Sequence, residues 1–391
     1  MRKVVVAGIG QTAFGKFLDR SVRSLAEEAL QQALRDADVD ASRIGVVFFA
    51  NALSGLITGQ ETIRGQVALR HTPLMGTPIV NVDNACASGS SAFNLAWMSV
   101  ASGQVDVALA IGAEKLTHED KAVTFGAFAS GVDVDERKRM MRETPLTHSM
   151  FMDIYAARTR KYMTESGATA EDFAAVCVKS RYGASLSPWA QFRDELTVED
   201  VLTARVISNP LTLPMCSPIA DGAAAAILVS EDVAKALGCP NVEVRASKIV
   251  SANRDGADPV CAVRAGQQAY EQAGLGPEDI HVAEVHDASA AAEIMLYERL
   301  GFAEPNRGVE LLRRGVTSIG GRLPVNPGGG LLSRGHPVGA TGIAQIVELT
   351  TQLRGAAGKR QRDRAKVALA ECSGGEIGSD SALAAVTILA V

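Results

Sequence analysis

The sequence contains few aromatic residues, no excess of basic residues and no closely spaced pair of cysteines. Phe, Trp and Tyr make up 5% of the 391 residues, and the formal net charge is −5. A nucleic-acid surface needs clustered Lys and Arg to neutralise phosphates, so we predict no nucleic-acid partner. Without a CxxC pair, we predict neither a disulfide framework nor a metal site. The six cysteines are scattered at positions 86, 177, 216, 239, 261 and 372.

Signals for export or membrane insertion are also missing. The N-terminus has no charged-then-apolar leader, no apolar run is long enough to span a bilayer, and the residues Ile388 to Val391 are not a peroxisomal tripeptide. We therefore expect a cytoplasmic protein with free thiols and no membrane partner.

Apolar residues and glycine are abundant instead. The hydrophobic share is 47% and there are 37 glycines, which is typical of tightly packed helices and strands joined by glycine turns. Short apolar runs alternate with helical patterns, and this alternation predicts an α/β fold. The runs fall at 4–9, 46–50, 105–111, 223–229, 282–285, 367–370 and 383–389.

Two pairs of segments repeat the same order of elements. Residues 22–53 and 262–289 each contain an alanine-rich helix, a short turn and an apolar strand. Residues 84–114 and 333–375 each contain a small-residue motif, a helix and a strand. Helix-then-strand units recur by chance in α/β proteins, but the matched order favours a duplication of two halves.

The pattern changes between the halves, at about residues 118–205. We expect charged turns at 133–144 and amphipathic helices at 151–165 and 170–182. This segment is predicted to be an inserted, mostly helical domain beside the carboxyl edge of the sheet, where a ligand would bind. A structural lid or a contact between subunits would produce the same pattern.

The segment NACASGSSA places Cys86 at the entrance to an alanine-rich helix, with only small residues after it. Free backbone N–H groups and the positive end of the helix dipole favour a thiolate there, and small neighbours admit a substrate carbonyl. Cys86 is therefore a candidate nucleophile with a lowered pKa. A cysteine among alanines is also commonly a small buried hydrophobe, which is how we interpret the other cysteines except Cys372.

The segment NPGGG and the following GHPVGATG carry His336 at a second small-residue entrance to a helix. In the repeat, His336 is the counterpart of the Cys86 region. If the halves pack about a pseudo-twofold axis, the two helix starts converge and the imidazole can take the thiol proton. The alternative is a histidine that packs in a glycine turn without a chemical role.

Two further segments end strands in the second half. The segment EVHDA carries His286, and ECSGGEIG carries Cys372 followed by glycines. The carboxyl ends of strands are where α/β sheets present their sites, so Cys372 is a candidate acid/base group and the glycines are candidate oxyanion donors. The alternative is a structural histidine and a buried thiol beside a bend.

Together these motifs resemble the thiolase superfamily over essentially the whole chain. Its pattern has a nucleophilic cysteine, a GHP-x-GATG histidine and a cysteine in CxGGGxG, which fall on Cys86, His336 and Cys372. The sterol-carrier-protein branch has an HDCF motif, which residues 286–289 resemble. The chain departs from these patterns at Ala288, where that branch has cysteine, and at Glu376, where CxGGGxG has glycine. The combination resembles a bacterial or archaeal member of that branch.

The resemblance implies a thiolase fold, with duplicated βαβαβαββ-type halves in an α-β-α-β-α layering and an inserted helical loop domain. It divides the chain into an N-terminal half (1–117 plus about 206–250), a loop domain on the coenzyme A side (118–205) and a C-terminal half (251–391). It also implies a homodimer or a tetramer, and we expect the strand near 105–111 to be an edge strand that pairs with a second copy.

The resemblance further implies an acyl-CoA C-acyltransferase that cleaves or forms a carbon–carbon bond through an acyl group on Cys86. In that mechanism His336 takes the thiol proton, Cys372 exchanges protons with the enolate and with coenzyme A, and His286 with a water stabilises the enolate oxygen. The backbone N–H groups of Cys86 and Gly374 form a second oxyanion site. Coenzyme A and acyl-CoA are substrates, and no permanently bound cofactor is implied.

Two other functions fit the same motifs. One is a biosynthetic condensing enzyme that forms acetoacetyl-CoA and works with a partner enzyme. The other is a thiolase-fold subunit that binds acyl-CoA without thiolysis, or acts as an aldolase, and relies on a partner protein. The presence of Cys86, His336 and Cys372 together favours thiolysis over the second function.

Overall fold

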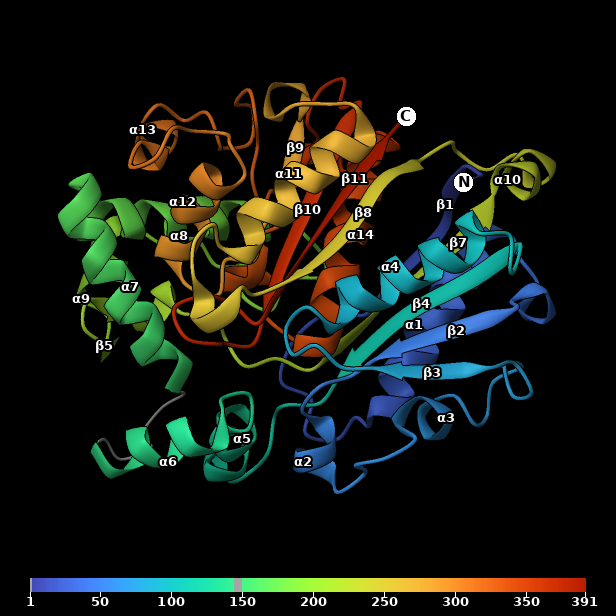
Figure 1. Ribbon diagram of the computed structural model, residues 1–391, viewed down its shortest axis with the longest axis horizontal. Helices are drawn as coiled ribbons and strands as arrows, with labels where there is room; N and C mark the ends of the chain where they lie inside the picture. Colours follow the sequence, from blue (N-terminus) through green and yellow to red (C-terminus); the bar gives the residue numbers. More distant parts are fainter. Residues whose placement is uncertain (1, 144–149) are drawn as a thin grey trace.

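The computed structural model describes residues 2–143 and 150–391 (Figure 1). A small ribbon pairs β5 (Val206–Ser208) with β6 (Leu211–Thr212). The large sheet of the described residues contains β1 (Val4–Gln11), β2 (Val46–Ala50), β3 (Ile79–Val82), β4 (Val107–Glu114), β7 (Gly222–Ser230), β8 (Glu243–Ser251), β9 (Val282–Glu284), β10 (Val367–Gly374) and β11 (Leu383–Ala390). The order across it is β3-β2-β4-β7-β1-β8-β11-β10-β9.

The sheet consists of two halves that repeat one arrangement. In the N-terminal half, β2 and β4 are parallel, and β7 and β1 follow with antiparallel pairing. In the C-terminal half, β9 and β10 are parallel, and β11 and β8 follow with antiparallel pairing. The halves join at β1 and β8, where Val5 pairs with Glu243. The predicted duplication is confirmed.

Helices occupy the outer faces of the halves and the space between them (Figure 1). α1 (Val22–Ala37) packs on β1 and β7, and α11 (Cys261–Ala273) packs on β8 and β11. α4 (Ser88–Ala101) and α14 (Val338–Leu353) pack against each other between the strands of the two halves. Alanine favours helix and lets a helix lie close to its neighbours, which suits these positions. The layering is the predicted α-β-α-β-α.

Glycines let the two central helices touch. A Cβ atom on Gly342 of α14 would lie 2.2 Å from the Oγ of Ser90 in α4, and one on Gly89 of α4 would lie 2.9 Å from the carbonyl oxygen of Gly339. A larger side chain at these positions would push the helices apart. The small residues of the two helix-entrance motifs therefore set the distance between the two helix starts.

The segment between the halves is helical, as predicted. The expected charged turns at 133–144 are wrong, because a helix begins at Val134 and Thr144 lies outside the described residues. The carboxylate of Asp133 accepts hydrogen bonds from the N–H groups of Asp135 and Glu136, and this cap starts the helix. The helices here are α5 (Lys121–Ala129), α6 (Val134–Glu143), α7 (Met150–Ser166), α8 (Ala170–Ser185) and α9 (Val198–Thr203).

The remaining helices are short. Among the residues that the structure describes, no helix is long and apolar enough to cross a membrane. The α-helices are α2 (Ser54–Thr58), α3 (Arg64–Ala68), α10 (Glu231–Leu237), α12 (Ala290–Arg299) and α13 (Gly308–Arg313), a π-helical turn covers Gly330–Arg334, and 3-10 turns cover Ala41–Arg43, Leu213–Met215, Arg254–Gly256, Pro277–Asp279 and Gly358–Arg360.

The edge of the N-terminal half is not the strand expected from the sequence. The run at 105–111 forms β4, which lies between β2 and β7. The edge strand is β3, whose sequence Ile-Val-Asn-Val is short and partly polar. β3 and β8 both lack a continuous apolar run, so hydrophobic periodicity does not predict them.

Candidate active site

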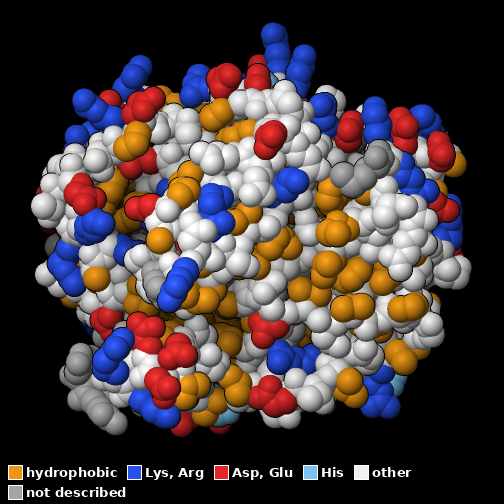
Figure 2. All heavy atoms as spheres, in the orientation of Figure 1, with side chains coloured by type: hydrophobic (Ala, Val, Ile, Leu, Met, Phe, Trp, Pro, Cys, Tyr) orange, Lys and Arg blue, Asp and Glu red, His pale blue; other side chains and the backbone are white. Residues whose placement is uncertain are grey.

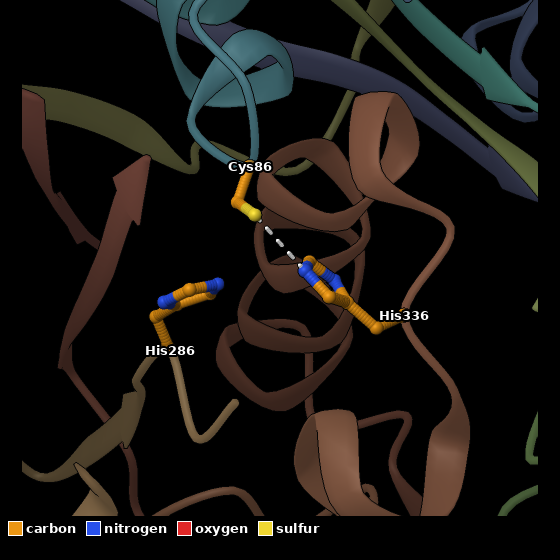
Figure 3. Close-up of side chains that lie close together, drawn as sticks. All are labelled: Cys86, His286 and His336. Carbon is orange, nitrogen blue, oxygen red and sulfur yellow. Dashed lines mark hydrogen bonds between the residues drawn. The ribbon is translucent and has the colours of Figure 1, made fainter. Parts of the chain in front are cut away.

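Cys86 lies in the turn between β3 and α4, and its side chain points toward the C-terminal half (Figure 3). Ala85 before it has a left-handed backbone with a φ of 49°. The N–H groups of Ala87 and Ser88 donate to the carbonyl oxygens of Asn84 and Ala85. This tight turn leaves the Cys86 side chain partly exposed, as a nucleophile requires.

His336 contacts Cys86 from the other half. Its Nε2 lies 3.2 Å from the Sγ of Cys86. His336 stands two positions before α14, and Cys86 stands two positions before α4. The Nδ1 of His336 lies 2.7 Å from the Oγ1 of Thr341, whose hydroxyl donates to the carbonyl oxygen of Pro337. Because the Thr341 hydroxyl hydrogen already bonds to Pro337, the hydroxyl oxygen can only accept from His336. Nδ1 therefore carries a proton, and Nε2 can accept the proton of the thiol. The structure brings the predicted pair together.

Both partners are neutral in the resting site. Burial raises the pKa of the Cys86 thiol to about 12, and the carboxyl groups of Glu376 and Glu114 add to the rise. Burial also lowers the pKa of His336 well below its usual value, with His286 contributing. The expected lowering of the Cys86 pKa is therefore wrong, because loss of water and two carboxyl groups outweigh the start of α4.

Cys372 reaches the same turn from β10. Its thiol donates a hydrogen bond to the carbonyl oxygen of Cys86 at 3.1 Å, and its side chain is fully buried. Burial, followed by the charges of Glu371 and Cys86, raises the pKa of Cys372 well above its usual value. Gly374 lies so close to the turn that a Cβ atom there would be 2.2 Å from the carbonyl oxygen of Asn84. A protonated thiol and a glycine backbone thus flank Cys86.

His286, in the loop after β9, lies beside Cys86 and His336 (Figure 3). Together with Cys372, these residues form a cluster of four side chains. The ring centroid of His286 is 5.2 Å from that of His336, edge to face. Its Nε2 is buried and has no hydrogen-bond partner among the described residues, and burial lowers its pKa to about 4. A buried nitrogen without a partner is costly unless a ligand or water meets it, so the ring indicates a place for a bound group.

Three of these side chains form a set of donors with metal-like spacing. The Sγ of Cys86 and a ring nitrogen from each of His286 and His336 lie within 4.8 Å of one another. Cysteine and histidine are ligands that Zn²⁺ prefers. A soft divalent cation bound here would occupy the Cys86 sulfur and compete with any reaction at it.

Glu114 is a site residue that the motifs do not reveal. Its buried carboxylate accepts hydrogen bonds from the N–H groups of Ala52, Ser54 and Gly339, at 2.8 to 3.0 Å. It therefore ties the end of β4 to the start of α14, just beyond His336. Its sequence signal is a carboxylate at the end of an otherwise apolar strand.

The two departures from the thiolase pattern lie beside the cluster. The carboxylate of Glu376 accepts two hydrogen bonds from the guanidinium of Arg158 in α7, at 3.0 and 2.6 Å. This ion pair joins the inserted segment to the loop that follows Cys372. Ala288 lines a small cavity together with His286. The departures thus change the wall around the cluster and leave the cluster itself complete.

Residues 4–232 match the family profile described as thiolase, N-terminal domain, and residues 243–389 match the one described as thiolase C-terminal domain-like. The chain belongs to the thiolase family. This thiolase is 39% identical over 385 residues to the acetyl-CoA acetyltransferase of Methanothermobacter thermautotrophicus, with 97% of this chain and 98% of the relative covered. It is 38% identical over 385 residues to sterol carrier protein 2 of Bos taurus, with 94% and 69% covered.

A solved structure, the Ltp2-ChsH2(DUF35) aldolase, superposes on this thiolase with a TM-score of 0.82 at 26% identity, with 100% of this chain and 98% of that chain covered. The resemblance to thiolases and to their sterol-carrier-protein branch is confirmed, and so is the thiolase fold. This thiolase is an acyltransferase that acts on acyl groups carried by coenzyme A.

Proposed function

We propose that this thiolase cleaves 3-oxoacyl-CoA with coenzyme A through an acyl group on Cys86, and forms the same carbon–carbon bond in the reverse direction. The distance of 3.2 Å between the Sγ of Cys86 and the Nε2 of His336 carries this proposal. A neutral imidazole at that distance can take the thiol proton at the moment of attack.

The first half of the reaction breaks the bond between the α and β carbons. The Cys86 thiol gives its proton to His336, and the thiolate attacks the ketone carbon. The electron pair of the broken bond forms the enolate of acetyl-CoA or propionyl-CoA, which takes a proton from the thiol of Cys372. The contact of the Cys372 thiol with the carbonyl oxygen of Cys86, at 3.1 Å, supports that role.

The second half restores the starting protonation states of Cys372, Cys86 and His336. Coenzyme A gives its thiol proton to the Cys372 thiolate and attacks the thioester on Cys86. The Cys86 thiolate leaves and recovers its proton from His336. The products are acetyl-CoA or propionyl-CoA and the shortened acyl-CoA, so the enzyme is unchanged and no oxidant or reductant is needed.

Two oxyanions need hydrogen-bond donors during these steps. We assign His286, with a water, and His336 to the enolate oxygen, and the backbone N–H groups of Cys86 and Gly374 to the tetrahedral intermediate. The buried, unpartnered Nε2 of His286 and the close approach of Gly374 to the Cys86 turn support the assignment.

The inserted segment at 118–205 is proposed to hold the pantetheine and nucleotide of coenzyme A, with parts of 206–250. Its helix α7 faces the cluster, since Arg158 pairs with Glu376 and Tyr155 lines the cavity beside His286. Its Lys and Arg residues can meet the phosphates even though the whole chain is acidic.

A biosynthetic role remains an alternative, because the same site condenses two acyl groups when run in reverse. A non-thiolytic or aldolase subunit is the other alternative, and the aldolase similar to this thiolase is a two-component protein by its name. The complete set of Cys86, His336 and Cys372 supports thiolysis, since an aldolase has no need of an acyl-accepting thiol. Rates in both directions, with and without candidate partner proteins, separate these functions.

The test is the loss of acyl transfer in Cys86→Ala. We expect this variant to lose thiolysis of acetoacetyl-CoA and the acetyl adduct that mass spectrometry detects on the wild type. Cys216→Ala, which removes a buried thiol outside the cluster, is the matched control and should keep both. Thiolysis by Cys86→Ala at the wild-type rate would overturn the proposal.

A further inference from the structure

A small cavity beside the cluster is lined in part by residues that have no role in the proposed reaction. It has a volume of about 40 Å³ and is lined on the cluster side by His286, Ala288 and Ser373. Tyr155, Arg158 and Arg299 form much of the rest of the wall. One water needs about 10–15 Å³, so the cavity has room for a group the size of a carboxylate.

The two arginines in this wall differ in their pairing. Arg158 is held by the carboxylate of Glu376. Arg299, at the end of α12, has no hydrogen bond or ion pair with any residue that the structure describes, although its side chain is partly buried and the positive charge of Arg158 is close by. An unpaired guanidinium beside a like charge is costly and gains most from an anion.

The nearby acidic residues are already engaged. The carboxylate of Glu371 accepts from the N–H of His286 and from the hydroxyl of Ser373. The carboxylate of Asp380 accepts from the N–H groups of Cys261 and Ser381. Both carboxylates interact electrostatically with Arg299, but neither accepts a hydrogen bond from it.

We propose that the Arg299 cavity binds a carboxylate on the acyl chain, so that the preferred substrates are 3-oxoacyl-CoA thioesters of dicarboxylic acids. This inference rests on the proposed function. The guanidinium of Arg299 receives the carboxylate, whereas the charge of Arg158 is already offset by Glu376. Ala292, Met295 and Leu296 line the same cavity and contact the methylene groups of the chain.

Coenzyme A phosphates do not account for the arginines. The pantetheine arm separates the thiol from the nearest phosphate by more than ten bonds of about 1.5 Å, on the order of 15 Å when extended. The cavity shares His286 with the reacting cluster, so an anion in it lies close to the reacting carbon. The acyl chain is the part of the substrate that can place a charge there.

The kinetic test compares two 3-oxoacyl-CoA thioesters of equal chain length, 3-oxoadipyl-CoA with a terminal carboxylate and 3-oxohexanoyl-CoA without one. We expect the wild type to prefer 3-oxoadipyl-CoA in kcat/KM, and Arg299→Met to reduce that preference about tenfold to a hundredfold, as expected for one charge-assisted contact. Arg299→Lys, which keeps the charge, should retain part of the preference. Arg307→Met, at an exposed arginine paired with Glu310, is the control and should retain all of it.

A binding test keeps the inference separate from the proposed function. Adipate should slow the alkylation of Cys86 by iodoacetamide more than hexanoate does, and Arg299→Met should abolish the difference while circular dichroism shows a folded protein. If thiolysis fails with every substrate but adipate protects through Arg299, the proposed function is wrong and the anion site stands. If thiolysis proceeds with the same substrate ratio in wild type and Arg299→Met, the anion site is wrong and the proposed function stands.

Discussion

At the scale of single residues, the proposed nucleophile Cys86 depends on a neighbouring base and not on a lowered pKa. The pKa of Cys86 is raised and that of His336 is lowered, so proton transfer between them is uphill in the resting site. The transfer becomes favourable when a substrate carbonyl offers the sulfur a carbon to attack. The thiol therefore stays mostly protonated between turnovers.

The alkylation of Cys86 by iodoacetamide should report this state through its pH dependence. A thiol with a raised pKa loses its proton only in alkaline solution, so we predict a rate that rises from neutral pH to at least about pH 9. Peptide mapping after brief labelling measures it, with the partly exposed Cys239 as an internal reference. A flat rate between about pH 5 and 7 would instead indicate a thiolate–imidazolium pair and would contradict the prediction.

Cys372 should transfer protons without bonding to the acyl group. We predict that Cys372→Ser lowers the rate of thiolysis by about 10²- to 10⁴-fold, the usual contribution of a general acid. The acyl adduct on Cys86 should still be detectable by mass spectrometry. If this variant works at the wild-type rate, the acid/base role belongs to another residue, and His286 is the next candidate.

The sequence predicted the four side chains of the cluster but not their electrostatics. Cys86, His336 and Cys372 stand in motifs of small residues, and His286 stands at the end of a strand. The duplication indicated that the two helix starts converge. The raised pKa of Cys86 depends on burial and on carboxyl groups that come from elsewhere in the chain. Such long-range neighbours have no local pattern, and the local sign of Glu114 is limited to a carboxylate at the end of an otherwise apolar strand.

At the scale of elements, the position of the site depends on the contact between α4 and α14. Gly342→Ala would place a Cβ atom 2.2 Å from the Oγ of Ser90. We predict a loss of about 1–3 kcal/mol in the free energy of unfolding and a larger fractional loss of activity, because the helix starts move apart.

Thermal unfolding and the kcat for thiolysis measure the two effects of Gly342→Ala. Gly266→Ala in α11 is the control, since its nearest atom would be 3.4 Å away, and it should be neutral or slightly stabilising. Equal effects of the two substitutions would show that the helix contact is not tight.

The inserted segment should become protected from hydrogen exchange when coenzyme A binds. We predict slower exchange in 118–205, mainly in α7 and α8, because the pantetheine arm would pass between this segment and the cluster. Pantetheine without the nucleotide should protect fewer peptides. Protection confined to the C-terminal half would contradict the placement of coenzyme A.

Most elements of the fold follow from sequence patterns, and the exceptions have physical causes. The alanine-rich helices and the continuous apolar strands were predictable, since periodicity reflects burial. β3 and β8 alternate polar with apolar residues or are too short to show a period. α6 carries a high density of charge that resembles a turn, yet its Asp133 cap and the pairs Asp135–Lys138 and Glu136–Arg139 support a helix.

At the scale of the whole molecule, one face has the character of a contact surface. Figure 2 shows apolar side chains gathered over α4, β4 and β3. Met98 of α4 is 51% exposed and Val80 of β3 is 45% exposed. β3 is also the edge of its half of the sheet, and a further strand could pair with it if the side chain of Gln66, which donates to the carbonyl oxygen of Ile79, moved aside.

We predict a homodimer in which β3 pairs with its copy across a twofold axis and continues the sheet. Val80→Arg should weaken this dimer, and light scattering at micromolar concentration measures the mass. Leu213→Arg, at a residue 50% exposed and remote from β3 in sequence, should leave the mass unchanged. A fully active wild-type monomer would contradict the prediction.

The equivalent positions of Cys86 and His336 at the two helix starts bear on how a cysteine–histidine pair can arise. Two identical chains related by a twofold axis must carry the same residue at equivalent positions, so one half alone, as a dimer, would place cysteine against cysteine or histidine against histidine. Two thiols at 3 to 4 Å invite a disulfide, and two imidazoles offer no sulfur. Within one polypeptide the positions of Cys86 and His336 can differ. Because the two halves of one chain need not be identical, a thiol can lie opposite an imidazole here.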